Sequence, residues 1–166
     1  MTSDAITLLK ADHKEVRRLF REYRRTSDTA VKTKAKLVQQ IIELLTVHTY
    51  LENEVMYPQV RELMPELDEE VLESYEEHHV ADVLCAELAT MTPDDEHFEA
   101  KTIVLIDNVT HHIEEEEGDR FPKVRAGLSR TKLRDIGVIV EQARQRAPKS
   151  PAQPSAAKKL VDAVIS

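Results

Sequence analysis

Residues 48–61 read HTYLENEVMYPQVR, and residues 112–125 repeat this pattern as HIEEEEGDRFPKVR. Both copies fit H-x3-E-x4-[YF]-P-x-V-R, so His48 and Glu52 in the first copy match His112 and Glu116 in the second. Residues four apart on an α-helix lie one turn apart on the same face. Each copy is therefore expected to project one imidazole and one carboxylate from the same side of a helix.

The repeat extends to the segments that precede these two copies. His13 matches His78 at an offset of 65, close to the offset of 64 between His48 and His112. The chain therefore reads as a duplicated helix pair, with one histidine on each odd helix and a His/Glu pair on each even helix. The repeat also selects His78 and His112 from the histidine doublets at 78–79 and 111–112.

Apolar residues recur at the three- and four-residue spacing of amphipathic helices. The expected long helices are residues 4–25, a second helix capped by Ser27 or Asp28, residues 69–89, and a fourth opened by Thr92-Pro93 with the proline at its first position. A shorter helix is expected over residues 132–145. This pattern predicts an all-α, up-down-up-down four-helix bundle with an extra C-terminal helix and a tail.

Composition and length agree with one helical domain. The 166 residues are 41% hydrophobic and 33% charged, and three glycines are too few for the turns of an all-β fold. We expect three parts: a bundle over residues 1–128, a helix over residues 129–147, and a flexible tail containing proline and lysine over residues 148–166.

Several classes of protein are disfavoured by the sequence. No apolar run approaches the length of a membrane span, and the N-terminus does not resemble a signal peptide. The lone Cys85 cannot form an internal disulfide, which fits a reducing cytoplasm. A net charge of −8 argues against general binding of nucleic acid. The oligomeric state stays open, with a monomer among the alternatives.

Inward-facing groups from four antiparallel helices can converge at one level of a bundle. Buried carboxylates are costly without a compensating cation. Two divalent ions, each held by two histidines and bridged by both carboxylates, would satisfy the whole set, and mixed nitrogen and oxygen ligands suit iron better than structural zinc. The candidate ligands are His13, His48, Glu52, His78, His112 and Glu116.

The motifs DHKEVRRLF, HTYLENEVMYP, EEHH and HHIEEEEGDRFP, in this order, resemble the hemerythrin-like, HHE cation-binding family of non-heme diiron proteins. The resemblance covers residues 4–125. It implies a hemerythrin-like bundle with two iron ions joined by an oxo or hydroxo bridge. It also implies iron-ligand roles for His13, His48, Glu52, His78, His112 and Glu116.

This chain departs from the oxygen-carrying hemerythrins at two places. They have a further histidine four residues before the one that matches His78, and Ser74 stands there in this chain. They also have an aspartate five residues after the fourth-helix histidine, whereas Glu116 follows His112 by four. The smaller set of histidines leaves more open positions and argues against simple oxygen carriage. An additional ligand, from Glu115 or a tyrosine, stays open.

Other residues of these motifs have simpler expected roles. Tyr57 and Phe121 are interpreted first as core packing, with the alternative that Tyr57 hydrogen-bonds a ligand of the iron pair or gates access to it. Cys85 is expected to fill the core. The basic tail is expected to be disordered, or alternatively to dock a partner. His97 is expected at the surface. His79 and His111 are expected to face solvent or a helix boundary, with the alternative that they support the metal ligands.

The family resemblance implies binding or sensing of oxygen, decomposition of peroxide, detoxification of nitric oxide, or iron handling. We favour a diiron centre that reacts with hydrogen peroxide or nitric oxide, as in catalase-like or peroxidase-like stress defence. One alternative is a non-enzymatic binder or sensor of oxygen or iron. Another is a metal-free helical interaction module, which would fold fully in the presence of a chelator.

Overall fold

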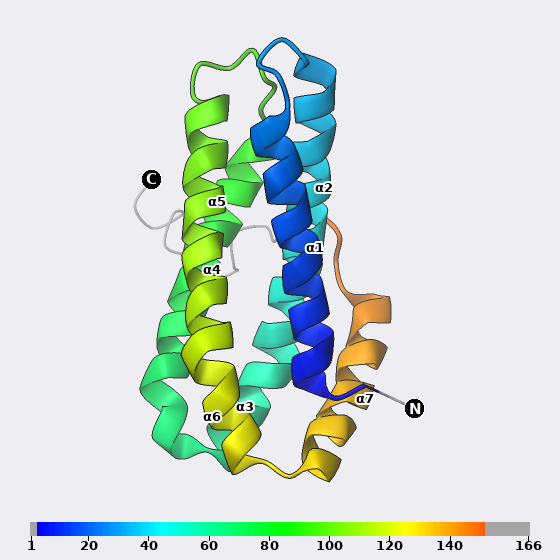
Figure 1. Ribbon diagram of the computed structural model, residues 1–166, viewed down its shortest axis with the longest axis vertical. Helices are drawn as coiled ribbons and strands as arrows, with labels where there is room; N and C mark the ends of the chain where they lie inside the picture. Colours follow the sequence, from blue (N-terminus) through cyan, green and yellow to red (C-terminus); the bar gives the residue numbers. More distant parts are fainter. Residues whose placement is uncertain (1–2, 152–166) are drawn as a thin grey trace, which may run out of the picture.

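The computed structural model describes residues 3–151, and these form a four-helix bundle with one further helix packed against its side (Figure 1). The all-α, up-down-up-down prediction is confirmed. Within the described residues, no helix is both long enough and apolar enough to cross a membrane. The α-helices are α1 (Ala5–Arg25), α2 (Val31–Leu51), α3 (Tyr57–Leu63), α4 (Asp68–Leu88), α5 (Phe98–Glu115), α6 (Phe121–Gly127) and α7 (Arg130–Arg146).

Three short helical turns connect these helices. Two π-helical turns, η1 (Glu52–Met56) and η3 (Glu116–Arg120), continue α2 into α3 and α5 into α6. A 3-10 turn, η2 (Pro65–Leu67), leads from α3 into α4. The sequence pattern did not predict the two π-helical turns.

Two of the predicted helix starts are wrong. α2 begins at Val31 without a side-chain cap, because the Asp28 carboxylate instead accepts from Lys34 Nζ at 2.9 Å. α5 begins at Phe98 and not at Pro93, since the Thr92 N–H donates to Asp95 Oδ2 at 2.7 Å and closes a turn before the helix. Aspartate side chains that bind nearby groups in this way compete with helix formation.

The other expected helix boundaries agree with the structure to within two residues. α1 is capped by Asp4, whose side chain accepts from the Thr7 N–H at 2.9 Å. α7 is capped by Ser129 in the same manner. Residues 148–151 follow α7 without forming a helix, and the rest of the predicted tail, 152–166, lies outside the described residues.

The apolar core is divided into two clusters by one polar level. Along α1, the first cluster ends at Leu9 and the second begins at Val16, with His13 buried between them. The same division occurs along α2, where His48 separates Leu45 from Leu51. A bundle core is normally apolar throughout, so this buried polar level requires a chemical explanation.

α7 packs against α1 and contributes to the first core cluster (Figure 1). Gly137 allows a close approach there, because a Cβ at this position would collide with the backbone carbonyl oxygen of Ser3. The extra helix is therefore held tightly against the start of the bundle. Its buried residues include Leu133, Ile136, Val140 and Ala143.

Candidate metal centre

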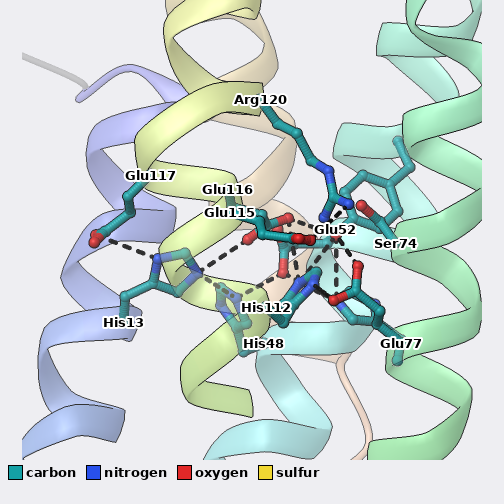
Figure 2. Close-up of polar contacts among 12 residues, drawn as sticks. His13, His48, Glu52, Ser74, Glu77, His112, Glu115, Glu116, Glu117 and Arg120 are labelled. Atoms are coloured by element: carbon teal, nitrogen blue, oxygen red, sulfur yellow. Dashed lines mark hydrogen bonds and ion pairs between the residues drawn. The ribbon is translucent and has the colours of Figure 1, made fainter. Parts of the chain in front are cut away.

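The polar level contains all six side chains that the sequence singled out, and each is at most 5% exposed. Figure 2 shows the labelled members converging from α1, α2 with η1, and α5 with η3. Their ligand-type atoms form two groups, each with all atoms within 4.8 Å of one another. These groups are His13, His48, Glu52 and Glu116, and Glu52, His78, His112 and Glu116.

The four imidazoles face one another in two pairs through their Nε2 atoms. In the first pair, His13 Nε2 lies 3.1 Å from His48 Nε2. In the second pair, His78 Nε2 lies 3.0 Å from His112 Nε2. Two nitrogens in such contact can share only one proton favourably, whereas both can donate lone pairs to a cation placed beside them.

The two carboxylates lie between the histidine pairs. Glu52 Oε1 is 2.7 Å from His48 Nε2 and 3.4 Å from His78 Nε2. Glu116 approaches the other histidine of each pair, with ion-pair distances of 3.3 and 3.4 Å. Each carboxylate therefore contacts both histidine pairs, as a ligand bridging two ions would.

The protein alone leaves these carboxylates incompletely satisfied. Both oxygens of Glu52 and Oε2 of Glu116 are buried without a hydrogen-bond partner among the described residues. The short distance from Glu52 to His48 lacks hydrogen-bond geometry. Such oxygens are costly to bury unless they bind a cation, so the donor set fits metal ions.

Charge coupling explains how the metal-free cluster can exist. Burial by itself lowers the pKa of His48, but Glu52 and Asp12 raise it to about 10. Burial likewise lowers the pKa of His112, and Glu116 raises it to about 10. The metal-free protein therefore holds protons on these two imidazoles, and metal ions would replace them.

The carboxylates show the complementary shift. Burial raises the pKa of Glu116, but His112 and His13 hold it well below the ordinary value. The pKa of Glu52 is also lowered, since His48 outweighs burial and the nearby Glu116. Both carboxylates are therefore charged in the range where a divalent cation would bind.

The π-helical turns place the carboxylates at a local widening of each helix. In η1 the Tyr57 N–H donates to the Glu52 carbonyl, five residues back. The next residue, Pro58, has no N–H to continue this register. The Asn53 carbonyl, which would pair with position 58 in the π register, instead accepts from the Tyr75 hydroxyl at 3.2 Å. The second copy forms η3 before Pro122.

Every histidine of the cluster turns its Nδ1 toward an oxygen of a neighbouring side chain. An Nδ1–H directed at such an oxygen leaves Nε2 free to bind a metal and fixes the ring. Three of these contacts are hydrogen bonds: His13 with Glu117 Oε1 (3.4 Å), His48 with Asp12 Oδ2 (3.0 Å) and His78 with Asn53 Oδ1 (2.7 Å). The fourth, His112 with Glu77 Oε2 (3.4 Å), is within ion-pair distance but lacks hydrogen-bond geometry.

The four residues that supply these oxygens obey the same internal repeat. Asp12 and Glu77 each precede the histidine of an odd helix by one residue, and Asn53 and Glu117 each follow the glutamate of an even helix. None of the four was among the predicted site residues, although the repeat offsets relate them directly. The pattern differs in one respect, because Asn53 supplies a neutral amide where Glu117 supplies a carboxylate.

Tyr57 does more than pack in the core. Its hydroxyl donates to Glu116 Oε1 at 2.6 Å and lies 3.2 Å from His78 Nε2. Burial and the Glu116 carboxylate hold the pKa of Tyr57 well above its ordinary value, so the hydroxyl keeps its proton. Its repeat counterpart, Phe121, stacks on His13 with ring centroids 5.7 Å apart. The packing interpretation is confirmed for both residues, since Tyr57 and Phe121 belong to the first core cluster, and Tyr57 makes the hydrogen bond to Glu116 in addition.

A cavity of about 20 Å³ adjoins Glu116 beside Tyr57. This is space for about one water or a molecule of similar size. Ser74 lines the cavity at the position where oxygen carriers have their further histidine, and its hydroxyl donates to the Glu70 carbonyl at 3.1 Å. Apolar side chains complete the wall, including Met56, Val71 and Phe121.

The remaining candidates lie outside the cluster. The Glu115 carboxylate pairs with Arg120 at 3.0 Å and with His111 at 3.1 Å, so the structure does not bring it to the two histidine pairs. Cys85 is buried in the second core cluster, as expected. His97 is exposed, as expected, and so are His79 and His111.

Comparison with known proteins identifies related sequences and folds. The family described as Hemerythrin HHE cation binding domain matches residues 4–124. A protein of Nostoc sp. (strain PCC 7120 / SAG 25.82 / UTEX 2576) described as a DNA nickase is 30% identical over 122 residues, which cover 74% of this chain and 34% of the relative. This chain thus spans about a third of that relative's length.

A solved structure has a similar fold. The crystal structure of a hemerythrin HHE cation binding domain-containing protein from Mycobacterium kansasii matches with a TM-score of 0.70 and 19% sequence identity. The match covers 87% of this chain and 89% of that chain. At this identity the likeness establishes the fold.

Proposed function

Since the chain belongs to the hemerythrin HHE cation-binding family, which implies metal binding, we propose that it is a non-heme diiron protein that reacts with hydrogen peroxide, nitric oxide or both. The observation that carries the proposal is the sharing of Glu52 and Glu116 between two groups of ligand-type atoms. The proposed activity is catalase-like or peroxidase-like stress defence.

The proposed ligands divide between two metal positions. His13 and His48 form the first position, His78 and His112 form the second, and the two glutamates belong to both. An iron pair, when bound, supplies redox-active, electron-accepting positions for peroxide or nitric oxide. Six side chains for two ions leave room for such a molecule.

The chain's own residues favour reaction at the second position. The Tyr57 hydroxyl lies beside His78 and is a protonated donor that can bind a negatively charged oxygen or supply a proton to it. The small, mostly apolar cavity adjoins the same side and limits the water that reaches Glu116. In the first position the counterpart, Phe121, provides no hydroxyl.

Two further points concern the cellular location and the function described for the Nostoc relative. We propose a reducing cytoplasm as the location, which a single buried thiol at Cys85 fits. The nickase description of the Nostoc relative is not carried over, because this chain covers only 34% of that protein.

The test combines metal analysis with rapid mixing. We expect about two irons per chain by elemental analysis, an absorption spectrum of a bridged ferric pair, and oxygen release or spectral change on mixing with peroxide or nitric oxide. A matched pair of variants, His48→Ala and the exposed His97→Ala, should separate loss of the centre from nonspecific effects.

The outcomes distinguish the proposal from its alternatives. Two irons with no response to peroxide or nitric oxide would contradict the proposed reaction. A reversible spectral change with oxygen, without turnover of peroxide, would instead support a non-enzymatic oxygen binder or sensor. Absence of metal after reconstitution with ferrous iron would support the metal-free interaction module.

A further inference from the structure

A chain of contacts connects α7 to the first metal position. Arg144 Nη2 on α7 donates to Asp12 Oδ2 at 3.0 Å. The same oxygen faces His48 Nδ1 at 3.0 Å. Asp12 is only 8% exposed, so its charge is screened mainly by these two partners rather than by water. α7 lies beyond residues 4–124, the region that the family comparison matches.

The second metal position has a similar arrangement built from residues of the bundle. Arg120 Nη1 donates to Glu77 Oε1 at 3.0 Å, and Glu77 Oε2 faces His112 Nδ1 at 3.4 Å (Figure 2). Each position therefore has an arginine, a carboxylate and an imidazole in series.

The two arginines are not related by the internal repeat. At the offset of 64, Arg120 corresponds to Met56, which packs in the first core cluster and carries no charge. The first half of the bundle therefore has no arginine at the position that matches Arg120, and its Arg17 pairs instead with Glu117, the residue that faces His13. Arg144 occupies the equivalent role from a helix outside the repeat.

The packing of α7 fixes Arg144 in place. Val140 lies one turn before Arg144 and Ala143 one residue before it, and both are completely buried. Gly137 brings α7 against the backbone at the start of α1, which is the helix that carries Asp12. The guanidinium is therefore presented by a helix with little freedom to move.

We propose that α7 is a functional part of the metal centre and that Arg144 is a positioning residue for its first position. Arg144 holds Asp12, and Asp12 orients His48 and strengthens it as a ligand. The inference rests on the proposed function for the assignment of the six ligands. Partners that act through a ligand in this way typically change metal affinity by about 10–100-fold.

The experiment is an anaerobic titration of the full-length, metal-free protein with ferrous iron, in competition with a chelator. For Arg144→Met we expect one of the two ions to bind about tenfold more weakly and the other to be unchanged. Arg144→Lys, which keeps the charge, should recover most of the affinity. The control is Arg146→Met, an exposed arginine on the same helix.

The corresponding variant at the second metal position tests whether each arginine affects the binding of one ion only. Arg120→Met should weaken the other ion, so the free-energy changes of Arg144→Met and Arg120→Met should add in the double variant. Strong non-additivity would indicate one shared position and would overturn the assignment. Thermal unfolding of the metal-free variants shows whether a loss of metal affinity comes from a destabilised fold rather than from a displaced ligand.

The result that overturns the inference is clear. Wild-type affinity for both ions in Arg144→Met, or equal weakening of both ions that Arg144→Lys does not recover, would remove the positioning role. A wild-type chain with fewer than two ions would instead refute the ligand assignment and this inference with it. Two well-bound ions without reaction with peroxide or nitric oxide would refute the proposed activity and leave the role of Arg144 standing.

Discussion

Glu116 combines complete burial, a negative charge and an oxygen without a hydrogen-bond partner. Glu116→Gln keeps the size of the side chain and removes the charge. Because this carboxylate is proposed to bind both ions, we expect the metal content to fall for both positions. Elemental analysis after dialysis measures the loss. Glu114→Gln, an exposed change on α5, should retain the metal.

Tyr57→Phe removes the hydroxyl that donates to Glu116 in the cluster. We expect two ions still to bind, but the reaction with peroxide or nitric oxide to slow by about tenfold or more, because a positioned donor is lost. The lost hydrogen bond should also cost about 1 kcal/mol of stability. The control is Tyr50→Phe, which packs on the same core cluster. Equal stopped-flow rates for wild type and Tyr57→Phe would remove the proposed role.

The histidine pKa values predict how protons compete with metal. The pKa values of His48 and His112 are raised to about 10 in the metal-free protein. Their contribution to stability is full below the ordinary value near 6.5 and is lost as pH rises toward 10. Metal ions must displace these protons, so loading at pH 7 should release roughly two protons per chain, and affinity should increase with pH. A pH indicator in weak buffer would detect the release, and loading without it would show that both imidazoles start neutral.

At the scale of single residues, the six candidate ligands could be read from the repeat, but Tyr57 and Arg144 could not be assigned. The repeat pairs Tyr57 with Phe121, and this match favoured a shared packing role. Only the structure shows that the hydroxyl reaches Glu116. The contact between Arg144 and Asp12 joins residues 132 apart in sequence, and no periodicity relates them.

At the scale of the elements, the close packing of α7 against the start of the bundle requires a residue without a side chain at position 137. Gly137→Ala would place a methyl group against the Ser3 carbonyl oxygen, and we expect it to destabilise the fold by about 1–3 kcal/mol. Gly118→Ala in η3 has no atom within 4 Å of the new methyl group, so we expect it to be neutral or stabilising by about 0.5 kcal/mol. Denaturant unfolding of the metal-free variants compares the two. Equal effects would indicate that α7 can shift to accept the methyl group.

The helices could be predicted from the spacing of apolar residues, whereas the connections between them could not. Thr92 and Pro93 looked like a helix start, but the Asp95 side chain closes a turn there. The π-helical turns have no periodic pattern of their own because each adds a single residue to a helical turn. The prolines at 58 and 122 were visible in the repeat, and in physical terms they mark where the helical hydrogen bonding changes.

For the whole molecule, bound metal should act as a large stabilising term. Ions that bind only the folded state stabilise it by about 4 kcal/mol at a free concentration a thousand times the dissociation constant. We therefore expect a chelator to lower the midpoint of thermal unfolding, and ferrous iron to restore it. An unchanged midpoint would contradict metal binding in the fold and favour the interaction module.

The division of the chain into parts is a further proposal at this scale. We propose that residues 1–128 form the diiron bundle and residues 129–147 form a helix that completes it. The packing of α7 into the first core cluster supports this interpretation. The sequence predicted the bundle and the extra helix, but it gave no indication of the face on which that helix packs.

The internal repeat has a consequence for the origin of the centre. Each helix pair supplies two of the four imidazoles and one of the two carboxylates, so a single pair carries half of a site. An ancestral chain of one helix pair would complete the site only as a symmetric homodimer. Fusion of two such copies into one gene would then free each half to mutate separately. In such a history, the two halves would have diverged at the residues around the ions. The differences would be Tyr57 and Asn53 in one half against Phe121 and Glu117 in the other, and they would have made two initially equivalent ion positions distinct.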